Sequence, residues 1–512
     1  MMAQEAKICA VVAAKSARAM WQQFRVAIKT VRAVELRLDW LEDDLEIERF
    51  IARLAAMRER KMPGADVTVI ATCRRREAGG RYRGTIAKQL IHLAEALRAG
   101  CEWYDLELES ASRCPEELLE VLLGEGKRIC SAHFFRRTPR NLKRVVADLS
   151  RARPDAIKVA AQCESLREAR GLLATARGRR DVIAVPMGEV ALPMRILALR
   201  EGSALAYAAV EDATAPGQVS LEEMNSLYRA DRITRRTAVY GVIGNPIAHS
   251  LSPQLQNEGF QARRIDAVYL PFLVRDLRDF KMAIEPLRMK GFSVTLPHKE
   301  AILRYLDDCD GLAEAIGAVN TVSVGVGGRL YGRNTDYIGV LRALERRMPL
   351  GGSRVLIFGA GGVARAVAFA LARGGASVAI CARRPERARA LARAAGGEAV
   401  ERRHLRSEFF DAIVNATPVG MHPATGRSPL EARELNCRLV FDTIYRPRVT
   451  KLMQLAARRG IESVSGVEMF VAQGTAQWEI WTGRRAPEKA MRAAVVAALE
   501  REERQLRNRH AR

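Results

Sequence analysis

The first 230 residues alternate short apolar segments with helical ones, and this alternation constrains the fold more than any other feature of the chain. The candidate strands occupy residues 8–12, 34–40, 67–73, 103–108, 128–133, 156–160, 182–186 and 204–210. Strands that alternate with helices favour a parallel sheet with crossover helices, and eight of them are typical of a (β/α)8 barrel. Such a barrel carries its site at the carboxyl ends of its strands, so polar residues at those ends are candidates for function.

Composition excludes several classes of protein. A chain of 512 residues suggests roughly three or four domains. The sequence has no apolar run that could span a bilayer and no export signal, so we expect a cytoplasmic protein with no membrane partner. Its nine cysteines form no CxxC pair, which predicts neither a zinc site nor a disulfide framework. The net charge of +24 comes from Lys and Arg interspersed with Glu and Asp, without a recognised nucleic-acid module, so we expect solvated helix faces and no nucleic-acid partner.

Charged side chains stand in or directly after the candidate strands of the first unit. They are Glu35, Arg37, Asp39, Arg74, His133 and Lys158. A lysine between Ile157 and Val159 on a buried strand must pair with a carboxylate or be partly desolvated, and desolvation favours the neutral, nucleophilic amine. A purely structural Lys–Glu pair is the alternative.

Six motifs of this unit, in order, resemble the type I 3-dehydroquinate dehydratases. They lie at residues 35–39, 72–74 with 79–80, 131–139, 157–159, 187–195 and 215–218. The resemblance implies that Lys158 forms a Schiff base with the ketone of 3-dehydroquinate, while His133 removes a proton and returns it to the departing hydroxyl. It also implies that Arg195 holds the substrate carboxylate, that no metal is needed, and that four residues bind hydroxyls or orient the catalytic groups. These four are Glu35, Arg37, Arg74 and Gln218.

One position departs from the family pattern. The family has a glutamate directly before the glycine pair, where it supports the histidine, but this chain has Ala78 there and Glu77 one residue earlier. A one-residue shift reverses a side chain on a strand but can be absorbed in a loop. Residues 221–232 then read as a closing helix, so the barrel is expected to occupy residues 1–232.

The second unit begins with a strand at residues 239–243, which ends in a turn before Ser250 and Ser252. Ser252 before Pro253 also fits an ordinary helix cap. Together with residues 291–299, 317–321 and 332–336, this stretch resembles shikimate dehydrogenase. The resemblance implies a substrate-binding set of Ser250, Ser252, Thr295, Asn320, Tyr445 and Gln473. Lys299 and Asp336 are expected to supply the proton for ketone reduction, with a plain salt bridge as the alternative.

A nucleotide site follows. An apolar strand at 354–358, a glycine-rich turn and a helix at 366–373 form a GxGxxA pattern whose helix start can receive a pyrophosphate. Arginines after the next strand, 377–381, predict NADP(H) because guanidinium groups bind a 2′-phosphate, although a solvated arginine cluster is the alternative. With the resemblance, the expected cofactor residues are Gly359, Ala360, Gly361, Gly362, Val363, Ala364, Arg383, Arg384, Arg387, Asn415, Thr417 and Gly466.

The expected fold is therefore α/β throughout, with a (β/α)8 barrel followed by a shikimate-dehydrogenase-like unit whose second domain is of the Rossmann type. We expect domains at 237–340 and 341–465, returning helices at 466–500 and a charged tail at 501–512. The expected function is a fused enzyme that converts 3-dehydroquinate through 3-dehydroshikimate to shikimate. Its alternatives are a quinate/shikimate oxidoreductase with an impaired barrel and, more remotely, a nucleic-acid-binding protein on a degenerate scaffold. The sequence does not predict an oligomeric state.

Overall fold

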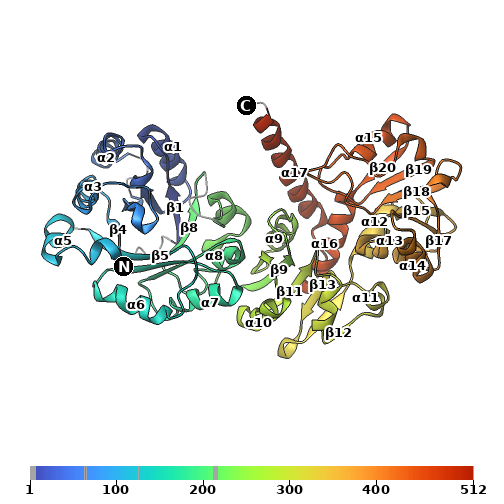
Figure 1. Cartoon of the computed structure of the whole chain (residues 1–512), viewed down its shortest axis with the longest axis horizontal. Coiled ribbons are helices and arrows are strands. Elements are labelled where there is room, and N and C mark those ends of the chain that lie inside the picture. The colour runs from blue at the N-terminus through green and yellow to red at the C-terminus, as the bar shows by residue number, and fades with distance from the viewer. Residues whose placement is uncertain (1–6, 63, 65, 125, 212–216, 511–512) are drawn as a thin grey trace. The chain divides into compact units, whose positions relative to one another are not determined.

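The computed structural model describes residues 7–510 except 63, 65, 125 and 212–216. The chain divides into two compact units, Met1–Thr237 with Phe272–Ala283 and Ala238–Pro271 with Ile284–Arg512. Figure 1 shows the strands and helices of each unit. In the described part of the chain, no helix is long and apolar enough to cross a membrane.

The eight predicted strands of the first unit are confirmed, and they form one parallel sheet in the order β7-β6-β5-β4-β3-β2-β1-β8. Their bounds are β1 (Ile8–Val12), β2 (Ala33–Arg37), β3 (Thr68–Thr72), β4 (Trp103–Glu107), β5 (Lys127–Phe134), β6 (Ala156–Gln162), β7 (Val182–Met187) and β8 (Ala206–Ala209). The amide of Ala204 donates to the carbonyl of Val182 at 2.9 Å, which ties the start of β8 to that of β7 and closes the ring.

Helices cover the outside of this barrel. They are α1 (Ala17–Ala27), α2 (Asp44–Glu59), α3 (Ile86–Arg98), α4 (Leu108–Ala111), α5 (Glu116–Leu123), α6 (Leu142–Arg151), α7 (Leu166–Ala174) and α8 (Leu192–Ile196). Inside, an apolar layer that includes Cys9, Ile70 and Ile129 is buried. Side chains alternate along a strand, so the next inward residues toward the carboxyl ends lie two positions further on, and these are the polar ones, such as Asp105 and Ser131.

Two expectations for this unit were wrong in detail. The second strand ends at Arg37 rather than residue 40, because Leu38–Trp40 forms a 3-10 turn that brings the Asp39 carboxylate onto the Arg37 guanidinium. The closing helix expected at 221–232 is broken into a π-helical turn (Glu223–Leu227) and a 3-10 turn (Ala230–Arg232). Arg229 between them has a φ of 49°, a left-handed conformation that no continuous helix contains.

Two six-stranded sheets follow the barrel in the chain. The first has the order β10-β9-β11-β13-β14-β12. Its strands are β9 (Ala238–Gly244), β10 (Ala267–Leu273), β11 (Met289–Val294), β12 (Asp308–Cys309), β13 (Thr321–Val324) and β14 (Leu330–Arg333). Helices α9 (Ser252–Ala262), α10 (Leu277–Leu287) and α11 (Gly311–Ile316) connect them. Because β9 and β11 are parallel neighbours, the segments that follow them leave the same edge of the sheet.

The second sheet is parallel and has the order β17-β16-β15-β18-β19-β20. Its strands are β15 (Arg354–Phe358), β16 (Ser377–Cys381), β17 (Glu398–Ala399), β18 (Phe410–Asn415), β19 (Cys437–Asp442) and β20 (Glu462–Ser465). The helices are α12 (Asp336–Glu345), α13 (Gly362–Arg373), α14 (Pro385–Ala395) and α15 (Lys451–Arg458). Counted along the chain from β15, this is the doubly wound order 3-2-1-4-5-6, which confirms the Rossmann-type prediction.

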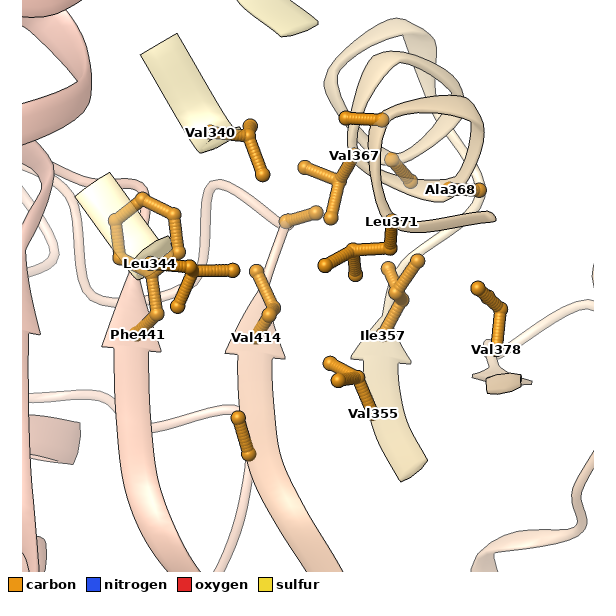
Figure 2. Packing of buried hydrophobic residues seen from close by; sticks show 14 of the residues in the cluster. Val340, Leu344, Val355, Ile357, Val367, Ala368, Leu371, Val378, Val414 and Phe441 are labelled. Carbon is orange, nitrogen blue, oxygen red and sulfur yellow. The ribbon is translucent and has the colours of Figure 1, made fainter. Parts of the chain in front are cut away.

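Figure 2 shows how the nucleotide sheet is held to its helices: Val355, Ile357 and Val414 pack against Val367 and Leu371. The predicted strands at 354–358 and 377–381 are confirmed as β15 and β16. The helix expected from residue 366 begins four residues earlier, at Gly362, directly behind the glycine turn.

Two helices end the chain, α16 (Gly466–Thr482) and α17 (Glu488–His510). The expectation that residues 501–512 form an irregular charged tail was wrong as far as His510, because α17 continues to that residue. Its mixed Arg and Glu residues are good helix formers, and Glu500, Glu502 and Glu503 have partners elsewhere in the unit. The Trp478 side chain of α16 is fully buried in the core.

Candidate active sites

The centre of the barrel holds a buried lysine between two carboxylates. The Lys158 Nζ atom donates to Glu35 Oε1 at 2.8 Å and to Asp105 Oδ2 at 3.0 Å. It also lies 4.2 Å from the centre of the Tyr207 ring. All three charged residues are at most 5 % exposed. The predicted inward-facing lysine is therefore present. Its charge is compensated by two carboxylates, which lie on strands that are far from residue 158 in the sequence.

A second chain of contacts links the same carboxylate to the histidine. Arg74 donates to Asp105 Oδ1 at 2.7 Å, and its other terminal nitrogen lies 2.7 Å from His133 Nε2. Ser131 donates to the same Oδ1 atom at 2.6 Å. Burial and the positive charges of Arg74 and Lys158 lower the pKa of His133 well below its usual value. The imidazole is thus kept neutral, the form that can accept a proton.

These groups line one cavity of about 360 Å³. The predicted residues on its wall are Glu35, Arg37, Arg74, His133, Lys158, Arg195 and Gln218. Arg37 is held by both oxygens of Asp39, at 2.9 and 2.8 Å, and Arg195 Nε donates to the carbonyl of Pro186 at 2.6 Å. All seven barrel residues predicted from the sequence are therefore brought together. The predicted 215–218 motif lies partly outside the described residues, but its Gln218 reaches the cavity.

The structure locates the acidic residue before the glycine pair. Glu77 bonds to Arg75 at 2.8 Å and its side chain is 69 % exposed, so it faces solvent. Ala78 is buried in the place before Gly79. Among the described residues, the buried Nδ1 atom of His133 has no hydrogen-bond partner. The histidine is consequently held from its Nε2 side, by Arg74, and not by a carboxylate from this loop.

In the second unit, the predicted proton donor pair is in contact. Lys299 Nζ donates to Asp336 Oδ2 at 2.6 Å, and Asn320 Nδ2 donates to Asp336 Oδ1 at 2.8 Å. Asn320 Oδ1 accepts in turn from the amide of Thr335 at 2.7 Å. The lysine is 22 % exposed and the aspartate 8 % exposed, so the ammonium can meet a ligand while the carboxylate stays behind it.

The other expected substrate residues surround the ends of β9 and β11. Thr295 follows β11 directly and its amide donates to the carbonyl of Ile243 at 3.0 Å. Ser252 is the first residue of α9, and its amide donates to Ser250 Oγ at 3.3 Å. The helix-cap alternative for Ser252 is wrong, because the cap position is Leu251 and no side chain caps this helix.

Tyr445 and Gln473 both contact Phe470 of α16. The Tyr445 and Phe470 rings lie 4.6 Å apart, and Gln473 Nε2 donates to the carbonyl of Phe470 at 2.9 Å. Strand β19 ends at Asp442, so Tyr445 belongs to the loop that follows rather than to a strand. A side chain on Gly339 would lie 3.2 Å from Gln473, which places Gln473 against the helix that Asp336 begins.

The glycine turn has the geometry that a pyrophosphate requires. Gly359 has a φ of 129°, and an added Cβ there would lie 2.9 Å from the carbonyl of Ala416, so no larger residue fits. Nothing lies within 4 Å of the space that a Cβ on Gly361 or Gly362 would fill, at the start of α13. The turn therefore leaves an open cradle at a helix N-terminus, as a dinucleotide needs. Ala364 packs into the core beneath it.

The neighbouring strand end carries the predicted arginines. Arg383, Arg384 and Arg387 are exposed, and in the described part of the chain no carboxylate is bonded to any of them. On the other side, Asn415 Oδ1 accepts from Thr417 Oγ1 at 2.7 Å. Gly466 begins α16, where a Cβ would lie 2.4 Å from the carbonyl of Thr443, so its need for glycine is explained by close backbone packing.

Sequence reasoning missed several residues of these sites. Asp105 is the most important residue that was missed. It lies on β4 between Trp103 and Glu107, and a charged residue inside a candidate strand was the signal that had identified Glu35 on β2. Asp442 was also missed: it accepts from Asn415 Nδ2 at 3.0 Å, and burial raises its pKa to about 6. Gln477 donates to the carbonyl of Asn320 at 3.1 Å and carried no motif signal at all.

Both units of the chain match known protein families. Residues 8–235 match the type I 3-dehydroquinase family. Residues 242–322 match the shikimate dehydrogenase substrate binding domain, 342–429 the shikimate / quinate 5-dehydrogenase family, and 466–496 the shikimate 5'-dehydrogenase C-terminal domain.

Whole-length and half-length relatives were both found. The chloroplastic bifunctional 3-dehydroquinate dehydratase/shikimate dehydrogenase of Arabidopsis thaliana is 35 % identical over 480 residues, which cover 89 % of this chain and 78 % of that protein. The shikimate dehydrogenase (NADP(+)) of Methanothermobacter thermautotrophicus is 43 % identical over 286 residues, which cover 53 % of this chain and 100 % of that protein. A shikimate dehydrogenase crystallised with NADP+ has a TM-score of 0.50 and 34 % identity, covering 52 % of this chain and 97 % of its own. By its similarity along the length of both units, the chain belongs to the family of bifunctional 3-dehydroquinate dehydratase/shikimate dehydrogenases.

Proposed function

We propose that the chain catalyses two successive steps of the shikimate pathway: its barrel dehydrates 3-dehydroquinate to 3-dehydroshikimate, and its second unit reduces that product to shikimate with NADPH. The observation that carries the proposal is the buried Lys158 ammonium between two carboxylates, in the same cavity as His133. The contact between Lys299 and Asp336 and the family membership support the second step.

In the barrel, Lys158 acts as the nucleophile. Its ammonium must lose a proton before the amine attacks the ketone, and Glu35 lies at 2.8 Å, within range to accept it. Asp105 at 3.0 Å has a strongly lowered pKa and keeps its negative charge. Loss of water then gives an iminium that acidifies the neighbouring C–H. His133, neutral because of its lowered pKa, takes that proton and returns it to the departing hydroxyl.

The remaining cavity residues bind the substrate. We assign its carboxylate to Arg195 and its hydroxyls to Arg37 and Gln218, which line the same cavity. Arg74 has a different duty in the free protein, where it holds the histidine ring from the Nε2 side. Its contact with Asp105 connects the base to the nucleophile.

In the second unit, Lys299 donates a proton to the carbonyl oxygen as it is reduced. Asp336 holds the ammonium 2.6 Å away, and Asn320 holds Asp336, so the donor is aimed before the substrate binds. We assign the substrate carboxylate to Ser250 and Ser252. Thr295, Asn320, Tyr445 and Gln473 are proposed to bind the carboxylate or the ring hydroxyls.

The cofactor is NADP(H), which supplies the hydride when bound. We propose that the open cradle at Gly359–Ala364 receives the pyrophosphate and that Arg383, Arg384 and Arg387 bind the 2′-phosphate, because they are exposed and no carboxylate bonded to them appears in the described structure. Asn415, Thr417 and Gly466 lie at the adjacent strand and helix ends and complete the set.

The ligands, the partners, the location and the domain division are predictions. We propose 3-dehydroquinate, 3-dehydroshikimate and shikimate as its small-molecule ligands, with neither nucleic acid nor membrane as a partner, and a cytoplasmic location. The domain division is likewise proposed: 1–232, 237–340, 341–465, 466–500 and the final residues.

A second candidate is a quinate/shikimate oxidoreductase with an impaired barrel. The match of residues 342–429 to a family that includes quinate dehydrogenases favours it, as does the loss of a carboxylate at Ala78. Ser250 and Ser252, together with the exposed Arg383 and Arg384, favour shikimate and NADP instead. Relative turnover of quinate with NAD+ and of shikimate with NADP+ distinguishes the two.

Trapping tests the barrel chemistry directly. Borohydride added with 3-dehydroquinate should reduce the iminium to a stable amine and add the mass of the bound ligand to the peptide that contains Lys158. The Lys158→Arg variant should gain no mass, while Lys299→Met should still be labelled although it no longer reduces the product. A label on a different lysine, or none in the native protein, would contradict the proposal.

A further inference from the structure

The loop that carries Tyr445 is tied down at both ends. Residues 443–450 connect β19 to α15, and we call them the tyrosine loop. Asp442 accepts from the amide of Ile444 at 3.1 Å and from Thr450 Oγ1 at 2.6 Å, so one buried carboxylate holds the first and last turns of the loop. Its central part, from Tyr445 to Val449, is half-buried or exposed and depends on other contacts.

Those contacts come from the carboxyl-terminal helix. Arg446 forms an ion pair with Glu502 of α17, and Arg448 reaches Glu500 at 3.0 Å and Glu503 at 3.4 Å. Glu500 and Glu503 are neighbours on the helix surface because they are three residues apart. Two arginines of one short loop thus meet three carboxylates of α17, and two of these, Glu502 and Glu503, lie in the segment that was expected to be only a charged tail.

The Arg446 pair is not an ordinary surface contact, whereas the Arg448 side chain is about one-third exposed. The Arg446 side chain is 17 % exposed, and in the described part of the structure its buried Nε atom has no hydrogen-bond partner. Burial also lowers the pKa of Arg446. A partly buried cation of this kind depends on its counter-charge more than an exposed one does, since less water is available to replace it.

The helix is a fixed support for the loop. Helix α17 packs against α9 and α16 (Figure 1), and its Arg492 pairs with Glu468 in the first turn of α16. Ser465, the cap residue of α16, donates to the carbonyl of Arg448 at 3.1 Å. Helix α16 also carries Phe470, on which the Tyr445 ring lies.

We infer that the end of α17, through Glu500, Glu502 and Glu503, is a positioning element for the tyrosine loop. It sets the place of Tyr445 and thereby the affinity of the reductase site for its small hydroxy-acid ligand. The inference rests on the proposed function of the second unit for Tyr445. It assigns to the chain terminus an electrostatic role, so that substrate affinity depends on ionic strength.

The test replaces the three glutamates together: Glu500→Gln, Glu502→Gln and Glu503→Gln. The KM for shikimate should rise about tenfold, the effect of losing three partly screened pairs, while kcat and the KM for NADP+ change less than about twofold. Salt at high concentration screens such pairs, so the native KM should climb with salt more steeply than that of the variant. A variant KM within about twofold of the native value at all salt concentrations overturns the inference.

Further variants test whether the change in KM is specific to the ion pairs between the tyrosine loop and α17. Glu488→Gln is the matched control, because it lies on the same helix in an exposed pair with Arg346 at 3.2 Å and should leave the KM unchanged. Arg448→Glu should raise the KM, and adding Glu500→Arg should restore at least half of the loss by reversing the pair. A double variant no better than the single one would count against the inference. Calorimetry of the full chain checks that the second unit of each variant is folded.

Hydrogen exchange separates this inference from the proposed function. Amides of residues 443–449 should exchange faster in the triple variant than in the native protein, whichever ligand the site binds. Unchanged exchange would contradict the positioning role. Native protein that fails to oxidise shikimate would contradict only the proposed function.

Discussion

Replacing Asp105 by asparagine should weaken the barrel and its reaction together. The carboxylate is fully buried and accepts from Arg74 at 2.7 Å, Ser131 at 2.6 Å and Lys158 at 3.0 Å. Asparagine keeps the shape but leaves buried cations without their counter-charge, which costs about 3–5 kcal/mol. For a unit of this size, that corresponds to a fall of about 6–20 °C in its unfolding temperature. Because Lys158 and Arg74 are both misplaced, the dehydratase kcat should fall at least about 100-fold.

The effect has a defined dependence on pH. Burial alone would raise the pKa of Asp105, but Arg74 and Lys158 hold it far below the ordinary range. A carboxyl with a depressed pKa stabilises the fold above its unfolded-state pKa of about 3.9, and this stability is lost as pH falls toward the folded-state pKa. The difference between native and Asp105→Asn barrels should therefore be full at neutral pH and shrink below about pH 4.

Calorimetry of the full chain, with both activities measured on the same sample, checks this prediction. The reductase activity should be unaffected by Asp105→Asn. Asp66→Asn is the matched control, since Asp66 pairs with Arg32 at 2.9 Å with both side chains more than half exposed. Its unfolding temperature should change by less than about 2 °C. If Asp105→Asn were equally mild, the account of the buried network would be refuted.

Three further predictions follow from the sites. On the acid side of the pH–rate profile, kcat/KM of the dehydratase should begin to fall only below about pH 6.5, because the pKa of His133 is lowered. A fall that begins above that pH would contradict this prediction. Glu77→Gln should change the dehydratase kcat/KM by less than about twofold, because the exposed carboxylate bonds to Arg75 and not to the histidine; a large loss would show that the loop rearranges around the substrate. Replacing Arg383 and Arg384 by alanine should raise the KM for NADP+ about 10–100-fold and leave the KM for NAD+ nearly unchanged. An equal rise in the KM for NADP+ and for NAD+ would count against 2′-phosphate binding.

Much of the fold could be predicted because it rests on local patterns. Alternating apolar strands and helices gave the barrel, and the strand, glycine turn and helix at 354–373 gave the nucleotide domain with an error of four residues at the helix start. Lys299 and Asp336 were paired through their motifs, and they are in contact. What local patterns missed was the exact end of each element, as at Asp39, where a turn closed on Arg37.

The contacts between distant strands could not be predicted in the same way. Asp105 meets Lys158 across the barrel because parallel register places both in the layer above the apolar core. The residue type at position 105 does not by itself predict that register. The helix at the end of the chain was missed for a related reason. Its mixed charges are typical of a solvated tail, and the sequence did not predict that Arg446 and Arg448 pair with its glutamates.

One assay tests the central claim that this chain contains both activities. Purified protein is mixed with NADPH and 3-dehydroquinate, with no second enzyme, and absorbance of the reduced nicotinamide is followed. The account predicts oxidation of NADPH that Lys158→Ala abolishes, while the same variant still oxidises NADPH when 3-dehydroshikimate is supplied. If native protein oxidises NADPH with 3-dehydroshikimate but not with 3-dehydroquinate, the barrel is not the dehydratase proposed and the two-step function is contradicted.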